Sequence, residues 1–358
     1  MTISIEIPQP DDWHVHLRDG DMLAAVVGYT ARRFRYALVM PNLVPAITST
    51  AAVATYRERI MAAVPVDAAD FRPLFAIYCS RVIDLDDLRR GAADGSIAAV
   101  KYYPAGATTN SAAGGSSMFD FMSLFEVMAD SEIRLLVHAE STDPAIDIFD
   151  REAHFLSEQL APVCAALPEL SVTVEHVSTS DGVDFVAAHP RCAATITPHH
   201  LARDRSHLLA NGMRPDLYCK PVINSTTDRA ALLAAATSGA KGYMLGTDSA
   251  PHPTTAKYGP VAKAGVFNAA YGLEVVAEAF YQAGRLDQLG QFASTNGVAC
   301  WGVEPPSSTI TLTRETIDRE LATSLTTTKG DEVVLFGTEE AALWTIQTTP
   351  VTAATFGC

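Results

Sequence analysis

The sequence predicts an α/β protein: a (β/α)8 barrel of the TIM type with a small accessory β-sheet made by the chain ends. Short apolar segments alternate eight times with Ala-rich stretches of helical character, which is the repeating unit of such a barrel. Several segments are continuously apolar, as expected for parallel strands covered by helices, and polar residues follow most of them. The 358 residues therefore predict one domain over residues 1–358, with the barrel core at about 11–300 and an accessory segment at about 301–358.

Eight strands are expected where apolar runs end in polar or turn residues. They are Trp13–Leu17, Tyr36–Met40, Leu74–Tyr78, Ala98–Tyr102, Leu135–His138, Val172–His176, Ala193–Thr197 and Tyr243–Gly246. The helices expected between them are Ala51–Ala63, Leu85–Gly91, Met118–Ala129, Ile148–Leu167, Asp181–Ala188 and Thr227–Ser238.

The chain after the barrel is expected to begin with helices at Leu273–Ala283 and Gln288–Thr295. Residues 305–330 are rich in Pro, Ser and Thr, and no strand is expected there. Strands at Glu332–Phe336 and Ala342–Thr348 are expected to join Ile3–Ile7 in the accessory sheet.

The composition excludes several classes of partner. A net charge of -15, from 26 basic and 41 acidic residues, argues against binding to nucleic acid or to an anionic membrane. The six cysteines show no C-x-x-C spacing, which favours a reduced compartment over a disulfide framework. No signal peptide or membrane-spanning apolar run is evident, so a cytoplasmic protein is expected.

The first barrel strand carries the motif from Asp11 to Gly20, D-D-W-H-V-H-L-R-D-G. Strict alternation along a strand would place His14, His16 and Arg18 on one face, with Trp13, Val15 and Leu17 on the other. A lone His-x-His pair is equally compatible with ordinary strand residues. The arginine and aspartate that follow at once favour a metal site next to an anionic substrate.

Polar residues recur at the C-terminal end of the other strands, which is where barrels of this kind carry their active sites. They are Asn42, Lys101, His138, His176, His199, His200, Asp248 and His252. The imidazoles of His14, His16, His138 and His176 and the carboxylate of Asp248 are ligand types that suit zinc. Five such ligands are too many for a single catalytic zinc ion, so two metal ions are expected. A hydroxide bridging two zinc ions would be a strong nucleophile at neutral pH, and Asp248 would move the proton during hydrolysis of an amide. Lys101, if neutral, could add carbon dioxide and bridge the metals as a carbamate.

Six motifs together resemble the dihydroorotases of the amidohydrolase superfamily, and most closely the short monofunctional type. They are H-V-H-L-R-D at 14 to 19, M-P-N at 40 to 42, K-Y-Y-P-A-G-A-T-T-N at 101 to 110, V-H-A-E at 137 to 140, E-H-V-S-T at 175 to 179 and G-T-D-S-A-P-H at 246 to 252. The likeness runs in order across nearly the whole chain.

The resemblance implies a role for each matching residue. His14, His16 and Asp248 would bind the first zinc and His138 and His176 the second. Lys101, as N6-carboxylysine, would bridge the two. The substrate carboxylate would be held by Arg18, Asn42 and His252, and the main chain near Lys220 and Ala264 would meet the pyrimidine ring. The loop with Thr108 and Thr109 would close over the substrate. The implied reaction is the reversible hydrolysis of dihydroorotate to N-carbamoyl-aspartate in pyrimidine synthesis, and a homodimer is expected.

Two alternatives stay open at this stage. Another cyclic amidase of the superfamily, such as a hydantoinase, dihydropyrimidinase or allantoinase, would share the metals and the carbamate but act on rings without the acidic group. A non-catalytic scaffold is the second. His199 and His200 are expected to have supporting roles, and Lys220 departs from members that carry leucine there.

Overall fold

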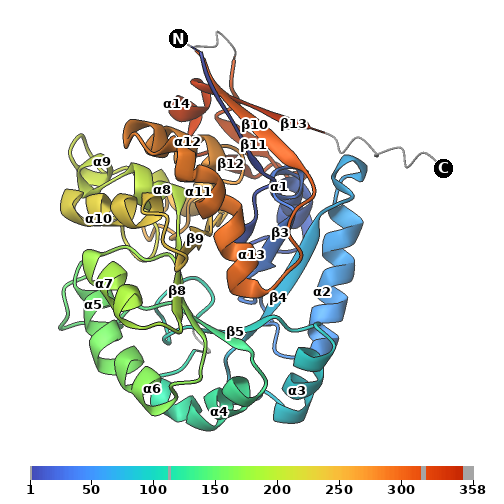
Figure 1. Cartoon of the computed structure of the whole chain (residues 1–358), viewed down its shortest axis with the longest axis vertical. Helices are drawn as coiled ribbons and strands as arrows, with labels where there is room; N and C mark the ends of the chain where they lie inside the picture. Colours follow the sequence, from blue (N-terminus) through green and yellow to red (C-terminus); the bar gives the residue numbers. More distant parts are fainter. Residues whose placement is uncertain (1, 112–113, 316–319, 350–358) are drawn as a thin grey trace.

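The computed structural model describes residues 2–111, 114–315 and 320–349, and at its centre eight parallel strands wrap into a barrel (Figure 1). The strands follow one another around the barrel in chain order. They are β2 (Asp12–Val15), β3 (Tyr36–Val39), β4 (Arg72–Tyr78), β5 (Ala99–Tyr102), β6 (Arg134–Val137), β7 (Val172–Val174), β8 (Cys192–Ile196) and β9 (Tyr243–Leu245). Each overlaps a strand expected from the sequence, so the predicted barrel is confirmed.

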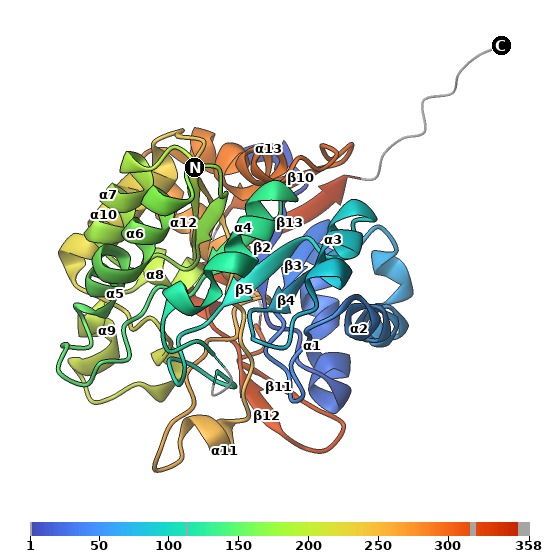
Figure 2. The same cartoon turned by 90° about the horizontal axis from the view of Figure 1, so that it is seen from below.

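Helices surround the barrel (Figures 1 and 2). Those packed around the barrel are α1 (Gly20–Arg33), α2 (Thr50–Ala63), α3 (Leu85–Ala93), α4 (Met122–Asp130), α5 (Arg151–Phe155), α6 (Ala161–Ala166), α7 (Ser180–Ala188), α10 (Thr226–Thr237), α12 (Gly272–Gln282) and α13 (Asn296–Trp301). Short helices in the loops are α8 (Pro198–Ala202), α9 (Arg205–Leu209), α11 (Thr254–Lys257) and α14 (Thr338–Ala341). No helix of the described residues is long and apolar enough to cross a membrane.

Three helical segments differ from the sequence-based expectation. The helix α1 is absent from that expectation, although Asp19 at its N-cap and the two arginines of its last turn are common helix-end signals. The expected helix Ile148–Leu167 is divided into α5, a π-helical turn and α6, with Pro162 near the start of α6. The expected helix Gln288–Thr295 is a π-helical turn at Gln291–Thr295 that leads into α13.

The accessory sheet is confirmed with two of its three predicted strands, Ile3–Ile7 and Ala342–Thr348, but the third predicted strand is wrong. Its three strands are β1 (Ile3–Pro8), β10 (Thr309–Arg314) and β13 (Trp344–Thr349), with β10 in the centre. The strand at β12 (Glu332–Val334) pairs instead with β11 (Ser324–Thr326) in a separate hairpin. Central strand β10 was missed in the Pro-, Ser- and Thr-rich stretch, although its sequence T-I-T-L-T-R alternates and buries Ile310 and Leu312.

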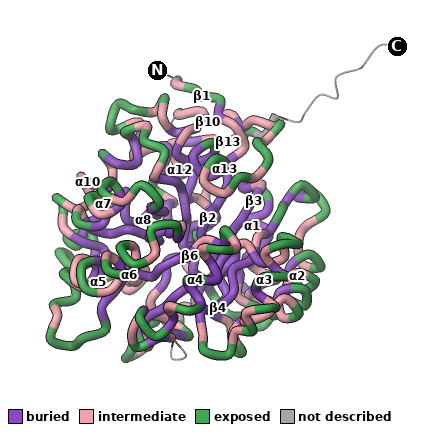
Figure 3. Tube along the Cα trace, turned by 60° about the horizontal axis from the view of Figure 1, so that its bottom comes forward, coloured by how far each residue is buried: buried purple, intermediate pink, exposed green. Residues whose placement is uncertain are grey.

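Apolar side chains from the barrel strands pack together in the barrel interior. The strands are accordingly among the most buried parts of the chain (Figure 3). Trp13 packs here, stacked on Trp301 with ring centroids 5.4 Å apart, whereas Val15 and Leu17 face the outer helices. The prediction that Trp13 shares the face of Val15 is therefore wrong. The pairing of β2 with β3 shifts register between Asp12 and Val15, and such a bulge re-aims side chains next to an active site.

The first and last strands of the barrel meet through Asp12. Its Oδ1 accepts hydrogen bonds from the main-chain N–H of His14 (3.1 Å) and Thr247 (2.8 Å), and its Oδ2 accepts one from the Thr247 hydroxyl (2.6 Å). The N–H of Asp248 also donates to the carbonyl of His14 at 2.8 Å. These bonds close the barrel and bring Asp248 beside the histidines of β2.

Replacing Asp12 with alanine should lower the free energy of unfolding by about 3 kcal/mol, because buried donors on both strands would lose their acceptor. Chemical denaturation of the variant would measure the change, with the exposed substitution Asp70→Ala as control. An Asp12→Ala protein as stable as the control would contradict the closing role of Asp12.

Candidate active site

The predicted residues converge on one cavity of about 330 Å³ at the C-terminal end of the barrel. The residues that line it are His14, His16, Arg18, Asn42, Tyr103, Thr108, Thr109, His138, His176, Lys220, Asp248, Ala250, Ala264 and Gly265. Two predicted residues lie just outside this lining: Lys101 is fully buried, and His252 lies against Arg18. The structure therefore brings together side chains from most of the barrel strands.

The first cluster joins β2 to the end of β9. His14 Nε2 lies 3.3 Å from His16 Nε2, and Asp248 Oδ1 lies 3.2 and 3.1 Å from these two nitrogens. Ligands of one tetrahedral zinc ion are separated by roughly 3.3 Å, given bond lengths of about 2.0 Å. The three atoms are therefore spaced as ligands of a single ion.

The tautomer of His16 leaves its Nε2 atom without a proton. His16 Nδ1 lies 2.8 Å from Asn42 Oδ1, and Asn42 Nδ2 donates to the carbonyl of Thr109 at 2.9 Å. The second bond fixes the orientation of the amide, so Oδ1 faces His16 and Nδ1 carries the proton. The lone pair of His16 Nε2 then points into the cluster, available to a metal ion.

The second cluster joins the ends of β6 and β7. His138 Nδ1 lies 3.0 Å from His176 Nε2, while His138 Nε2 lies 2.8 Å from Glu140 Oε2. The carboxylate accepts a hydrogen bond from Nε2–H, so the proton is on Nε2 and the Nδ1 lone pair is directed at His176. A carboxylate behind a histidine in this way orients metal-ligating imidazoles.

Lys101 lies between the clusters, against Glu175. The Lys101 Nζ contacts Glu175 Oε2, and Glu175 Oε1 lies 3.0 Å from His14 Nδ1. All three side chains are buried, yet Lys101 Nζ, both Glu175 oxygens and His14 Nδ1 have no well-aligned hydrogen bond among the described residues. Buried polar atoms of this kind require partners. The donor set therefore fits a bound metal cation.

Electrostatics supports the same conclusion. Burial lowers the pKa of Lys101 well below its usual value, against the opposing effect of Asp248. Burial likewise lowers the pKa of His16 to about 4 and that of His176 well below 6.5. Burial alone would raise the pKa of Asp248, but His14 and His16 outweigh it and hold that pKa well below 3.8. Neutral nitrogen ligands around an ionised carboxylate are the state that binds a cation.

One corner of the cavity is built to meet an anion. Arg18 Nη2 donates to His252 Nε2 at 3.1 Å, and Arg18 Nε donates to the carbonyl of Pro251 at 3.2 Å. Burial, followed by the charge of Arg18, lowers the pKa of His252 to about 3, so the imidazole is neutral and the arginine carries the charge. The Arg18 backbone has φ of 59°, which turns the chain out of β2 and places the guanidinium at this corner.

The side chain of Lys220 points along the cavity wall to Glu140. Its Nζ lies 3.6 Å from Glu140 Oε1, whose other oxygen holds His138. The ammonium group of Lys220 thus compensates the charge of Glu140, which in turn orients the candidate metal ligand His138. Lys220 and Ala264 both line the cavity, and their main-chain contacts with a substrate remain a prediction.

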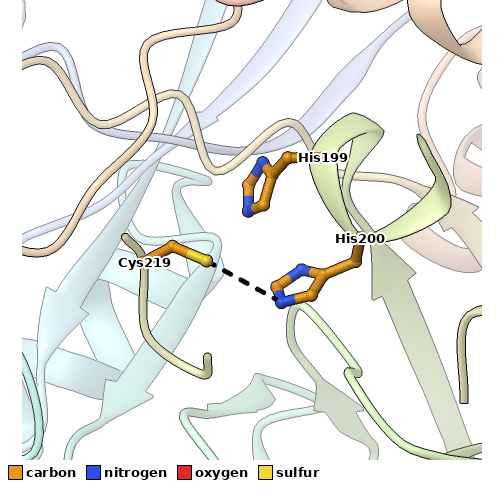
Figure 4. Close-up of side chains that lie close together, drawn as sticks. All are labelled: His199, His200 and Cys219. Atoms are coloured by element: carbon orange, nitrogen blue, oxygen red, sulfur yellow. Dashed lines mark hydrogen bonds between the residues drawn. The ribbon is translucent and has the colours of Figure 1, made fainter. Parts of the chain in front are cut away.

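A third cluster, His199, His200 and Cys219, resembles a metal site only in its proximity (Figure 4). His200 Nε2 lies 3.2 Å from the carbonyl of Pro221, which can only accept, and the Cys219 thiol donates to the same oxygen at 3.2 Å. Asn268 Nδ2 donates to the carbonyl of Thr247 and lies 3.1 Å from His199 Nδ1, so the proton of His199 is on Nε2. Each candidate ligand atom therefore carries a proton, which supports the expected supporting roles.

Sequence reasoning missed several residues around the site. Glu140 lies two residues after His138, and Glu175 lies one residue before His176. Both are part of the motifs given above, so an acidic residue next to a histidine at a strand end was the signal that could have identified them. Glu152 accepts hydrogen bonds from the main chain and hydroxyls of Ser178 and Thr179. No local signal in the sequence connects Glu152 with that loop.

In this parallel barrel the strand ends direct imidazoles, a lysine and an aspartate toward one cavity that is also lined by an arginine. That arrangement defines a class, the barrel hydrolases that use metal ions. The amidohydrolase family matches residues 11–312 of the chain. The dihydroorotase of Ruegeria pomeroyi is 50% identical over 88% of this chain and 91% of the relative. That of Erythrobacter litoralis is 45% identical over 97% of this chain and 100% of the relative.

Solved structures agree with these relatives. The dihydroorotase of Campylobacter jejuni superimposes with a TM-score of 0.85 at 32% identity, covering 98% of each chain. The dihydroorotase of Saccharomyces cerevisiae, in complex with 5-fluoroorotic acid, gives 0.87 at 27% identity over 97% of this chain and 99% of that one. The chain therefore belongs to the amidohydrolase family and, within it, to the dihydroorotases.

Replacing Glu175 with glutamine should weaken zinc binding roughly 10- to 100-fold, because the variant loses the negative charge beside His14 and Lys101. Competition between the metal-free protein and a chromogenic chelator would measure the affinity, with the exposed substitution Glu58→Gln as control. Equal zinc affinity in both variants would show that Glu175 has no part in the metal site.

Proposed function

We propose that the protein catalyses the reversible, zinc-dependent hydrolysis of the cyclic amide of (S)-dihydroorotate to N-carbamoyl-L-aspartate, the third step of de novo UMP synthesis. The observation that carries the proposal is the joint placement of the two histidine clusters and the Arg18 corner in one cavity. The dihydroorotase relatives supply the identity of the ring. We further propose a cytoplasmic homodimer with no nucleic-acid or membrane partner, in keeping with the net charge of -15.

We propose that His14, His16 and Asp248 hold one zinc ion and that His138 and His176 hold the other. Lys101, as N6-carboxylysine, would contribute to both. Bound zinc supplies a Lewis acid for the amide carbonyl and lowers the pKa of water toward 7. Carboxylation of Lys101 requires Glu175 to move away from Nζ, because two anions would otherwise meet there.

Asp248 is the proposed proton carrier. Its carboxylate lies at the cavity wall, ionised, with Oδ1 between His14 and His16. It can accept a proton as water adds to the carbonyl and return that proton to the amide nitrogen as the ring opens. Reversal of these two transfers gives ring closure.

Arg18, Asn42 and His252 are proposed to bind the substrate carboxylate. Arg18 provides the charge, and Asn42 keeps one amide hydrogen after its bond to Thr109. His252 accepts from Arg18 in this structure, which holds the guanidinium in place. The main chain of Lys220 and Ala264 would meet the ring, and the loop with Thr108 and Thr109 would close over it.

The alternatives differ in their need for an anion-binding corner. Hydantoinase and dihydropyrimidinase structures superimpose on this chain at 14 to 16% identity, which speaks for the fold alone. Arg18, partly buried and lining the cavity, favours a ring with an acidic substituent over a neutral ring. The complete set of candidate ligands argues against a non-catalytic scaffold.

The first experiment is to assay the purified protein with dihydroorotate, N-carbamoyl-aspartate, dihydrouracil, hydantoin and allantoin, before and after chelation and zinc restoration. Turnover of the first two alone, lost and regained with metal, is the expected result. Turnover of the neutral rings would overturn the assignment of the substrate.

In the same assay, Arg18→Met should reduce kcat/KM about 100-fold for dihydroorotate and leave any slow turnover of dihydrouracil unchanged, with Arg89→Met as control.

Two variants separate metal binding from proton transfer. Lys101→Ala should lose most bound zinc together with activity, because the bridging ligand is gone. Asp248→Asn should retain zinc through its remaining ligands but lose at least 100-fold in kcat, since an amide cannot carry the proton. Zinc measured by atomic emission beside kcat would show the contrast, and an active Lys101→Ala enzyme would refute the bridging role.

A further inference from the structure

Tyr103 carries a hydroxyl that the proposed reaction leaves without a role. The residue follows β5 directly and lines the same cavity as Arg18 and His138. Its side chain is only 1% exposed, and its hydroxyl has no hydrogen-bond partner among the described residues. A buried hydroxyl that lacks a partner costs free energy, so its presence at the cavity wall calls for an explanation.

The ring of Tyr103 is held firmly in place. It stacks on Tyr78 with centroids 5.2 Å apart and planes inclined by 30°, and the His138 ring lies 6.1 Å away. Lys101 Nζ lies 4.9 Å from the ring centroid. Contacts on several sides fix the direction of the hydroxyl before any ligand arrives, which reduces the entropy lost on binding.

The phenol keeps its proton in this environment. Burial, with smaller contributions from Tyr78 and Asp248, raises the pKa of Tyr103 well above 10, and Arg18 opposes the rise only weakly. Even without this rise, a tyrosine hydroxyl with an ordinary pKa near 10 is protonated at neutral pH and can donate a hydrogen bond. The neighbours that affect it, Arg18 and Asp248, are residues proposed to handle the substrate.

We propose that Tyr103 is a substrate-binding residue whose hydroxyl donates a hydrogen bond to an oxygen of the cyclic amide and of its ring-opened product. The inference rests on the proposed function and adds a contact to it. A site with a buried donor rejects ligands that leave the donor unpaired. The hydroxyl thus stabilises the complex, while in the free enzyme it contributes nothing to folding.

Tyr78 provides a matched control. It is fully buried, its hydroxyl also lacks a partner among the described residues, and it is absent from the cavity lining. Tyr103→Phe and Tyr78→Phe each remove one unpaired buried hydroxyl from the same aromatic pair. A general effect of removing such a hydroxyl should appear in both variants, whereas a substrate contact should appear in one.

The test uses the zinc-loaded enzyme, with kcat and KM measured for dihydroorotate and for N-carbamoyl-aspartate. Tyr103→Phe should lower kcat/KM roughly 10- to 100-fold, and Tyr78→Phe should stay within about twofold of wild type. Zinc content should be unchanged in both variants. The Tm of the protein without substrate should be unchanged or slightly raised in both. In an Asp248→Asn background, calorimetry should show about tenfold weaker binding of dihydroorotate when Tyr103→Phe is added.

Three outcomes overturn the proposal. If Tyr103→Phe matches Tyr78→Phe in kcat/KM, the hydroxyl does not contact the substrate. If Tyr103→Phe lowers Tm or zinc content, its role is structural. If the wild-type enzyme turns over neither substrate, the proposed function fails and this inference fails with it, a result distinct from the first two.

Discussion

The closure of the barrel between β2 and β9 is the constraint on which the site depends. Asp12 and Thr247 are 235 positions apart in the chain, and their buried hydrogen bonds fix the last strand beside the first. Asp248 follows Thr247 directly, and the N–H of His14 also donates to Asp12. The same bonds therefore set the distance from Asp248 to the histidines of β2. A barrel closed with a different register would keep its apolar core but separate these ligands.

The site is also a region where folding and function oppose each other. Burial lowers the pKa of His14 and of Lys101, while the neighbouring His14 and His16 lower the pKa of Asp248. In a protein without metal this arrangement leaves buried polar atoms poorly paired, which costs stability. A bound metal cation would supply partners for the carboxylate and imidazole atoms, and its affinity would then contribute to the stability of the folded protein.

The sequence was sufficient for the eight barrel strands because continuous apolar runs ending in polar residues are strong local signals. It was sufficient for the candidate ligands because His14, His138 and Asp248 each stand at such a strand end. It failed for Trp13, whose direction is set by a bulge that depends on pairing with β3. It also failed for β10, which is ordered by its two neighbours, and for Glu152, which reaches the loop after β7 from a separate helix. The division into barrel core and accessory segment remains a prediction.

The two kinds of histidine cluster in this protein show why proximity alone does not define a metal site. His199 and His200 lie as close to Cys219 as the ligands of a metal would, but the carbonyl of Pro221 and the amide of Asn268 keep protons on the atoms that face one another. At His16 and His138, the acceptors Asn42 Oδ1 and Glu140 Oε2 each accept a hydrogen bond from the outer N–H, and the inner lone pair is free. The residues behind the imidazoles therefore decide which cluster can bind a cation. Lys220 belongs to this second layer, since it balances the charge of the carboxylate that sets the tautomer of His138.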